Sequence, residues 1–366
     1  MRPHLLPFLV LILSGFAAAN DKEGFQPLFN GKDLAGWKVV NTAPSTWSFN
    51  EDGYLVCSGK PIGEIRTERM YQNFILELEW RHLVPKGNAG VFVWADDISA
   101  RGQPFIKGVE VQVLENAYGD NKSHTTHGDI FPIHGAIMTP VNGRGGQRAF
   151  PVENRSKPSP EWNHYRIECI DGAISLAVNG KIVTRGTDCN PRKGYLCLES
   201  EGGVVHWRNV RIKELPETPI APEQVATSDR GFRCLYTGVD FSGWQETAGW
   251  ESRDWELLSE AGAGPLLTKE NFKGDIGFIV DVKFKENSGT AHVTVKGKSI
   301  AIDPKSLTLE KTGSYNRIEG FVRGDVLTLE INGKSAGTFT GIPEEGPLGM
   351  HADGPAEWAN PYVRAL

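Results

Sequence analysis

The first candidates for chemistry in this sequence are an acid and an amide, Glu110 and Gln112, which alternate with valines. Successive side chains of a β-strand point to opposite faces, so Val109, Val111 and Val113 share one face and the acid and the amide share the other. If the valine face enters a core, the carboxylate and the amide project side by side from the opposite face. Such a pair could exchange a proton with a substrate and bind its hydroxyl groups. The alternative is an ordinary solvated strand residue, with Glu110 paired to a neighbouring lysine or arginine.

A polar loop from 116 to 130 follows this strand and carries His124, His127 and Asp129, and His134 comes shortly after it. Imidazole and carboxylate are usual ligands of divalent metals, so this group could bind an ion. The spacing H-x2-H-x-D-x4-H matches no metal motif, and a loop rich in glycine and asparagine also collects histidine without a metal. We therefore expect no cofactor, with a divalent cation as the alternative. His134 is a candidate general acid or substrate hydrogen-bond partner.

The elements that must position these residues are short β-strands. Alternating apolar and polar residues with frequent turn signals are typical of an antiparallel sandwich, and no segment has the pattern of an amphipathic helix. Asp171-Gly172 and Asn179-Gly180 predict tight hairpins. In the first half of the chain we expect strands at 47–49, 54–57, 64–67, 74–81, 91–94, 108–116, 165–170, 173–178, 181–183, 194–199 and 205–212.

Length and composition restrict the class of protein. A chain of 366 residues exceeds one typical domain, and its formal net charge of −6 makes it a poor candidate for binding nucleic acid. The N-terminus has the pattern of a bacterial signal peptide: Arg2, an apolar run from 5 to 16, and small residues before a cleavage near Ala19. We expect a periplasmic or secreted protein without a transmembrane segment, because that run is too short for an ordinary span.

Five cysteines are present: Cys57, Cys169, Cys189, Cys197 and Cys234. Export would permit disulfides, but the count is odd and no CxxC pair or zinc spacing occurs. Cys57, Cys169 and Cys197 lie in apolar strand-like runs and are expected to be small buried hydrophobic residues. A disulfide from Cys189 to Cys169 or to Cys197 stays open.

The chain contains two related copies of one pattern. The later segments and the earlier ones that they repeat are 236–244 and 29–37, 316–319 and 165–168, 329–334 and 176–181, and 349–354 and 197–202. The second copy is shorter and lacks the Glu110 strand and the histidine loop. Between the copies lies a proline-rich segment. We therefore expect a signal peptide at 1–19, a first domain carrying the site at 25–214, a linker at 215–229 and a degenerate second domain at 230–366.

Seven segments of the first domain occur in the order of a known family. They are 28–37, 71–77, 87–92, 109–116, 161–163, 178–180 and 207–210. On these segments the domain resembles the 3-keto-disaccharide hydrolase family, formerly a domain of unknown function; the second domain resembles it only weakly. The resemblance implies a concanavalin A-like fold. The predicted fold class is thus all-β, with two antiparallel β-sandwich (concanavalin A-like jelly-roll) domains in tandem.

One segment departs from the family pattern. Many relatives carry Leu-Gln-x-His-Gly before the final strand, whereas this chain has Leu198-Glu199-Ser200-Glu201-Gly202. Two carboxylates replace the amide and the imidazole, so a role given to that histidine does not carry over. A jelly roll can bring this strand beside the Glu110 strand, which would pair Glu110 with Glu199. The alternative for Glu199 and Glu201 is a charged sheet end or a calcium site.

The reaction for which the family is named gives these residues a task. A ketone at C3 of a sugar acidifies the proton on C2, so a carboxylate base can remove it while the aglycone leaves C1, and water then adds back. For this task the candidate catalytic residues are Glu110, Glu199 and His134. The residues expected to bind substrate are Gln112, Trp94, Arg66, Asn88 and Glu201, with Trp94 as a sugar-stacking platform unless it is a core residue.

Two functions are compatible with this sequence. We favour an exported glycoside hydrolase-like enzyme that acts on a 3-keto-glycoside or a related glycan. The alternative is a non-catalytic, lectin-like carbohydrate-binding module, because the same jelly-roll face serves both. A binding module would not need the carboxylates Glu110, Glu199 and Glu201. For the second domain we consider binding of a glycan or of a partner protein.

Overall fold

The computed structural model describes residues 24–118, 127–245, 248–284, 289–302 and 314–366. Within these ranges the only helices are two short 3-10 turns, η1 (Pro44–Thr46) and η2 (Pro222–Gln224), and strands make up most of the ordered elements. Neighbouring strands pair in the antiparallel sense. The predicted all-β class is confirmed. In the described part of the chain, no helix has the length and apolar character needed to cross a membrane.

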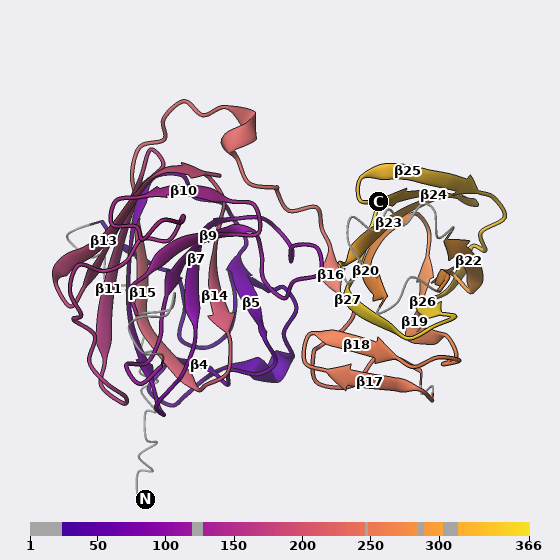
Figure 1. Ribbon diagram of the computed structural model, residues 1–366, viewed down its shortest axis with the longest axis horizontal. Helices are drawn as coiled ribbons and strands as arrows, with labels where there is room; N and C mark the ends of the chain where they lie inside the picture. The colour runs from indigo at the N-terminus through magenta and orange to yellow at the C-terminus, as the bar shows by residue number, and fades with distance from the viewer. Residues whose placement is uncertain (1–23, 119–126, 246–247, 285–288, 303–313) are drawn as a thin grey trace, which may run out of the picture.

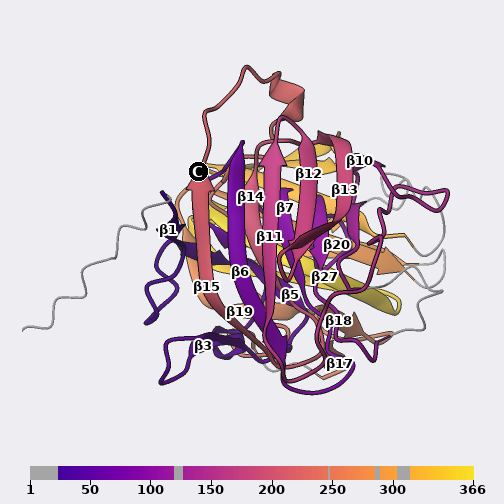
Figure 2. The same cartoon turned by 90° about the vertical axis from the view of Figure 1, so that its left-hand side faces the viewer.

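The first sandwich packs a nine-stranded sheet against a six-stranded sheet (Figures 1 and 2). The nine-stranded sheet contains β1 (Gln26–Pro27), β3 (Trp47–Phe49), β4 (Leu55–Cys57), β6 (Phe74–His82), β10 (Ile137–Pro140), β11 (Asn163–Ile170), β12 (Ala173–Val178), β13 (Lys181–Asn190) and β15 (Val205–Glu214). The six-stranded sheet contains β2 (Trp37–Val39), β5 (Gly63–Thr67), β7 (Gly90–Ala95), β8 (Gly108–Gln112), β9 (Ile130–Ile133) and β14 (Tyr195–Ser200). Their orders are β10-β13-β12-β11-β6-β15-β4-β3, with β1 beside β15, and β2-β5-β14-β7-β8-β9.

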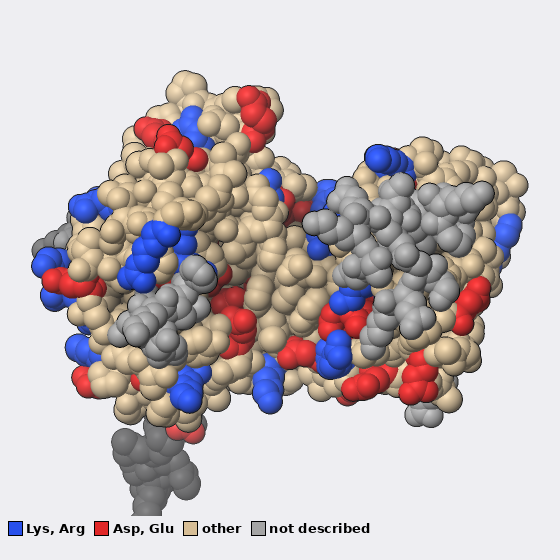
Figure 3. All heavy atoms as spheres, in the orientation of Figure 1, with Lys and Arg blue, Asp and Glu red and all other residues tan. Residues whose placement is uncertain are grey.

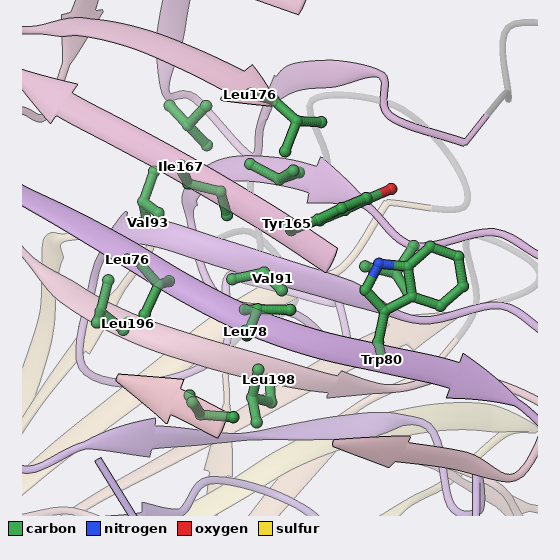
Figure 4. Packing of buried hydrophobic residues seen from close by; sticks show 14 of the residues in the cluster. Leu76, Leu78, Trp80, Val91, Val93, Tyr165, Ile167, Leu176, Leu196 and Leu198 are labelled. Carbon is green, nitrogen blue, oxygen red and sulfur yellow. The ribbon is translucent and has the colours of Figure 1, made fainter. Parts of the chain in front are cut away.

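Alternate residues of these strands fill the space between the two sheets. Leu76, Leu78 and Trp80 of β6 point into the same core as Val91 of β7 and Leu198 of β14 (Figure 4). These side chains are almost fully buried, and each such burial stabilises the fold by roughly 1.5–3 kcal/mol. The faces predicted from the alternation at 109–113 are correct, because Val109 and Val111 of β8 also enter this core. The strand predicted at 108–116 ends earlier, at Gln112, and the one predicted at 181–183 continues to Asn190.

The second sandwich repeats the strand order of the first. Its larger sheet contains β16 (Arg233–Cys234), β17 (Trp250–Arg253), β18 (Glu256–Ser259), β20 (Ile276–Phe284), β23 (Asn316–Arg323), β24 (Val326–Ile331), β25 (Lys334–Phe339) and β27 (Ala356–Ala365). Its four-stranded sheet contains β19 (Leu266–Lys273), β21 (Ala291–Val295), β22 (Lys298–Ile302) and β26 (Glu345–Ala352). The order β19-β26-β21-β22 corresponds strand for strand to β5-β14-β7-β8, and β25-β24-β23-β20-β27-β18-β17 corresponds to β13-β12-β11-β6-β15-β4-β3. A separate hydrophobic core lies between its sheets.

The two sandwiches meet in a packed interface. Phe92 and Ile106 of the first sandwich share a buried apolar cluster with Tyr362 of the second. The Arg317 guanidinium forms an ion pair with the buried Asp281 carboxylate at 2.8 Å and donates to the Ser99 carbonyl at 3.0 Å. These contacts lie on the face of the six-stranded sheet that points away from its core. The second sandwich therefore covers one end of that face.

The segment predicted as a linker, 215–229, is held against the first sandwich. Gln72 Nε2 donates to the Thr218 carbonyl at 2.9 Å, and Arg192 Nη2 donates to the Pro219 carbonyl at 2.7 Å. The cysteines are all free thiols, and four of the five are buried. The burial predicted for Cys57, Cys169 and Cys197 is confirmed.

Candidate active site

An acidic cluster lies on the core-distal face of the six-stranded sheet, which is the face that points away from the core. Val109 and Val111 enter the core with 0% exposure, so Glu110 and Gln112 lie on the core-distal face, as the alternation predicts. On β14, Leu198 enters the core and Glu199 takes the core-distal face. Figure 3 shows acidic side chains at the surface over the middle of this sheet. Burial excludes the solvated-strand alternative for Glu110, which is 5% exposed.

Gly90 of β7 leaves the space in which two carboxylates meet. A Cβ atom built on Gly90 would lie 2.9 Å from Glu110 Oε1 and 2.9 Å from Glu199 Oε2. Both oxygens border one small volume, and they are separated by no more than about twice that distance. Carboxyl pairs that act on one sugar residue are typically about 5–10 Å apart. The structure thus brings Glu110 and Glu199 close enough to contact one sugar ring.

Two further carboxylates extend this cluster. Glu64 of β5 lies directly opposite Glu199, and its Oε2 accepts a hydrogen bond from the Ile106 amide at 3.1 Å. Glu201 follows β14. Glu64 Oε1 and Glu199 Oε2 are buried without a hydrogen-bond partner among the described residues. Buried carboxylate oxygens usually have a partner, because removing them from water is costly. Neither oxygen therefore has a described protein partner that offsets this cost.

Burial and the proximity of other acids raise the pKa of the carboxyls in this cluster. Burial raises the pKa of Glu110 well above its usual range, and the charge of Glu201 raises it further, while Arg148 acts in the opposite direction. Burial, followed by the charges of Glu110, Glu201 and Glu64, likewise raises the pKa of Glu199. Burial raises the pKa of Glu201 to about 7. Closely spaced carboxyls share protons, so one can act as an acid while another acts as a base.

Amides and one arginine border the cluster. Gln112 Nε2 donates to Asn88 Oδ1 at 2.8 Å, and Asn88 Nδ2 in turn donates to Glu201. Three residues predicted to bind substrate therefore form one hydrogen-bonded chain. Arg148 forms an ion pair with the buried Asp129 at 3.0 Å, and its guanidinium lies over the Phe131 ring. The sequence reasoning missed Arg148 and Glu64, since neither belongs to a motif in the chain and only sheet pairing brings them here.

Trp94 is not the predicted stacking platform. Simple alternation along β7 would place it on the same face as Phe92. The pairing of β7 with β14 shifts register between Cys197 and Tyr195, and Trp94 has φ of 55°, which turns its side chain into the core. Its exposure is 0%, and its Nε1 donates to the Gln72 carbonyl at 2.9 Å. The interpretation as a core residue is correct.

Arg66 also lies apart from the carboxylates. Its Nε donates to the Asp97 carbonyl at 2.8 Å, and its guanidinium contacts Asp229 at 3.2 Å and the face of Tyr195. These contacts hold the segment after η2 against the first sandwich. A direct role of Arg66 in substrate binding is therefore not supported by its position.

The described residues of the histidine loop, His127 and Asp129, each contact another side chain. His124 lies outside the described residues. His127 Nε2 contacts Asn154, and Asp129 is paired with Arg148. Burial lowers the pKa of His134 to about 4, so its imidazole is neutral at pH 7 and a poor general acid. Its Nε2 is buried without a hydrogen-bond partner among the described residues, and the catalytic role of His134 stays a prediction.

A depression of about 500 Å³ on the nine-stranded sheet offers a useful contrast. It is lined in part by Glu77 and Glu79. Burial alone would raise the pKa of both groups, but Arg166, Arg208 and Arg211 outweigh it and lower the pKa. These carboxylates are already neutralised by their partners. The acidic cluster on the six-stranded sheet is therefore the better candidate for chemistry.

Three solved structures are similar to this chain over about half of its length. Two solved structures from Parabacteroides distasonis ATCC 8503, provisionally assigned as glycosyl hydrolases, are 25% and 26% identical to this chain. They cover 53% and 52% of it and 95% and 99% of their own lengths, with TM-scores of 0.41 and 0.40. The Bacillus licheniformis β-glucanase is 14% identical over 52% of this chain and 97% of its own, with a TM-score of 0.35. The comparison with curated proteins found no match.

A family model settles the assignment. The model described as "3-keto-alpha-glucoside-1,2-lyase-like domain" matches residues 24–213, which is just over half of the chain and all of the first sandwich except the last residue of β15. The matched range contains every residue of the acidic cluster. The chain therefore belongs to the 3-keto-alpha-glucoside-1,2-lyase-like domain family.

Proposed function

We propose that the acidic cluster cleaves the glycosidic bond of a 3-keto-glycoside by proton abstraction and elimination. The observation that carries this proposal is the convergence of Glu110 and Glu199 above Gly90, each with an oxygen 2.9 Å from one point. Membership of the family supports the substrate class. A carbohydrate is thus the proposed ligand of this face.

The surroundings of the two carboxyls suggest their roles. Arg148 favours the ionised form of Glu110, whereas the neighbours that affect Glu199 are other acids, which favour its protonated form. Glu110 is therefore the base and Glu199 the acid. Gln112 and Asn88 are suited to binding the hydroxyl or keto oxygens of the sugar, because their amides project beside the carboxyls.

The proposed reaction proceeds in two stages. Glu110 takes the proton from C2, which the ketone at C3 acidifies. The C2–H electron pair forms a C1=C2 double bond, the C1–O bond breaks, and the aglycone oxygen receives the proton of Glu199. Water then adds across the double bond, with hydroxide to C1 and a proton to C2, so the sum of both stages is hydrolysis.

A product assay tests this proposal. Wild-type protein is incubated with a 3-keto-glucoside, alongside Glu110→Gln, Glu199→Gln and the control Glu168→Gln. Glu168 lies on the nine-stranded sheet in an ion pair with Arg166 at 3.0 Å, away from the cluster. We expect the two cluster variants to lose release of the aglycone and the control to retain it. Unchanged turnover in both cluster variants, with their folding verified by circular dichroism, would remove these residues from the mechanism.

A lectin-like module is the second candidate. It is favoured by the Gln112–Asn88–Glu201 chain of side chains, which could bind sugar hydroxyls without any bond cleavage. Saturable binding of a glycoside by wild-type protein, together with no turnover on any 3-keto-glycoside, would support this candidate over the enzyme.

The proposal includes export and a division into domains. The apolar run from 5 to 16 supports a signal peptide cleaved near Ala19, and N-terminal sequencing of the protein secreted from a bacterial host would identify the cleavage point. The separate cores of the two sandwiches support a site-bearing domain at 25–214 and a second domain at 230–366.

A further inference from the structure

Two histidines face each other on the four-stranded sheet of the second sandwich. His292 of β21 and His351 of β26 are direct cross-strand partners. Their rings are stacked, with centroids 4.2 Å apart and planes 11° from parallel. Val293 and Met350 beside them enter the core, so both imidazoles lie on the opposite face of the sheet. A third group joins them: His292 Nε2 lies 3.2 Å from the Asp353 carboxylate.

These three side chains have the chemistry of a metal site. Among the described residues, they alone form a group of three or more potential ligands whose donor atoms all lie within 4.8 Å of one another. Ligands of a tetrahedral zinc ion lie about 3.4 Å apart, for bonds of about 2.1 Å. Small rotations of the side chains would bring the donors to that spacing. Two imidazoles with one carboxylate suit zinc and related transition metals, whereas calcium and magnesium prefer oxygen ligands alone.

One donor atom of the group has no partner within the described protein. His351 Nδ1 is buried and has no hydrogen-bond partner among the described residues. The Asp353 side chain is 61% exposed, so it is free to rotate. The group is reached from solvent, and its three ligands would leave a position for water or for an oxygen of a bound molecule.

The position of the group in the repeat is a separate observation. The segment Gly289-Thr290-Ala291-His292-Val293 corresponds to Gly87-Asn88-Ala89-Gly90-Val91, and β26 corresponds to β14. His292 thus stands where Gly90 stands, His351 where Glu199 stands, and Asp353 where Glu201 stands. The second sandwich carries its polar group at the same place on the sheet as the first, with imidazoles in place of carboxyls.

We propose that His292, His351 and Asp353 form a site for a divalent transition metal of the zinc type on the second sandwich. The ion is bound through one nitrogen from each imidazole and one carboxylate oxygen, and its remaining position is open. This site is independent of the acidic cluster and of the reaction proposed there. Its presence would make the second sandwich a metal-dependent binding surface rather than a bare copy of the first.

The test uses the full-length chain without an affinity tag, stripped with a chelator and titrated with Zn²⁺ alone in a calorimeter. We expect one saturable equivalent. His351→Ala and His292→Ala should each weaken binding by more than the roughly 10–100-fold that loss of a supporting hydrogen bond costs. The matched control is His164→Ala, on β11 of the nine-stranded sheet, and Glu199→Gln tests the acidic cluster as the competing site; both should bind as wild type does.

A spectroscopic measurement separates a built site from weak surface binding. Co²⁺ in place of Zn²⁺ should give visible absorption bands typical of four-coordinate geometry in wild type and not in His351→Ala. Circular dichroism of each variant verifies its fold. Zn²⁺ binding that does not saturate, or that stays unchanged in both histidine variants, would overturn the proposal. Binding lost in Glu199→Gln but kept in the histidine variants would also overturn it, because it would locate the ion on the first sandwich.

Discussion

The six-stranded sheet of the first sandwich and the four-stranded sheet of the second share one strand order but present different chemistry. In the first, Gly90 has no side chain, and Glu110 and Glu199 converge on the space that it leaves. In the second, His292 occupies the corresponding position and stacks on His351. The shared strand arrangement therefore does not by itself determine the chemistry of this face. The residues on the core-distal face decide whether it presents acids that share protons or imidazoles that suit a metal.

The largest effect should come from removing one member of the acid pair. Glu110→Gln and Glu199→Gln should each lower turnover of a 3-keto-glycoside by about 10²–10⁴-fold, the range for loss of a general acid or base.

Both variants should also melt at a higher temperature at neutral pH. The pKa of each carboxyl is raised in the folded state, so its stabilising contribution is full at low pH and is lost as the pH rises through that raised pKa.

Thermal unfolding measured at pH 5 and pH 8 checks this sign. The gain from Glu199→Gln should be larger at pH 8 than at pH 5. A variant that is less stable than wild type at pH 8 would indicate that the carboxylate serves the structure rather than the reaction.

The next effect concerns the space above Gly90. In Gly90→Ala the new methyl would lie 2.9 Å from both carboxylate oxygens, which must move apart. We expect a loss of turnover of about tenfold or more, because misplacing a catalytic group by about 1 Å can cost up to about 100-fold. The fold should survive, since the nearest atoms, which include Glu110 Cγ at 3.1 Å, belong to side chains and not to the backbone. Gly146→Ala is the control, as its Cβ would meet no atom within 4 Å. Equal turnover by Gly90→Ala and Gly146→Ala would show that the reaction does not require the space above Gly90.

A smaller effect should appear in the pH dependence of stability. Burial raises the pKa of Glu201 from 4.5 to about 7, so stability should fall as the pH rises through the interval between those two values. Glu201→Gln should flatten this part of the profile by an amount on the order of 1–2 kcal/mol, after allowance for the partial exposure of the group. Urea unfolding at several pH values measures it, and an unchanged slope would contradict the prediction.

The smallest effect should come from Glu77 on the nine-stranded sheet, which is compared with Glu199 on the six-stranded sheet. Glu77 accepts hydrogen bonds from Arg166 at 2.6 Å and from Arg211 at 2.7 Å, and its pKa is lowered despite burial. Glu77→Gln should therefore destabilise the protein at pH 7 by about 1 kcal/mol, opposite in sign to Glu199→Gln, with turnover retained. Chemical unfolding measures the change in stability of Glu77→Gln, and the same product assay measures its turnover. A gain in stability would mean that the arginines do not neutralise this carboxylate.

Periodicity along one strand was sufficient to predict part of this site. The alternation at 109–113 assigned the valines to the core and Glu110 and Gln112 to the other face, and both assignments are correct. Trp94 shows the limit of that rule, because a shift of register inside β7 reverses the face of a single residue. No pattern in the sequence predicts this shift of register.

Contacts between distant strands could not be read from the sequence alone. Arg148 reaches the cluster through its pairing with Asp129, and Glu64 joins it because β5 pairs with β14. His292 and His351 are 59 residues apart in number and meet only because β21 pairs with β26. Each of these depends on sheet register, which the chain specifies through its whole core rather than through a local motif.

The central claim is that Glu110 removes the proton from C2 of a keto-sugar. Its most direct test is exchange of that proton, followed by ¹H NMR of a 3-keto-glucoside in D₂O with wild type, Glu110→Gln and the control Glu168→Gln. We predict that wild type and the control replace hydrogen at C2 by deuterium in substrate or product, and that Glu110→Gln slows this by about 10²–10⁴-fold. Exchange at the wild-type rate in a folded Glu110→Gln protein would contradict the account.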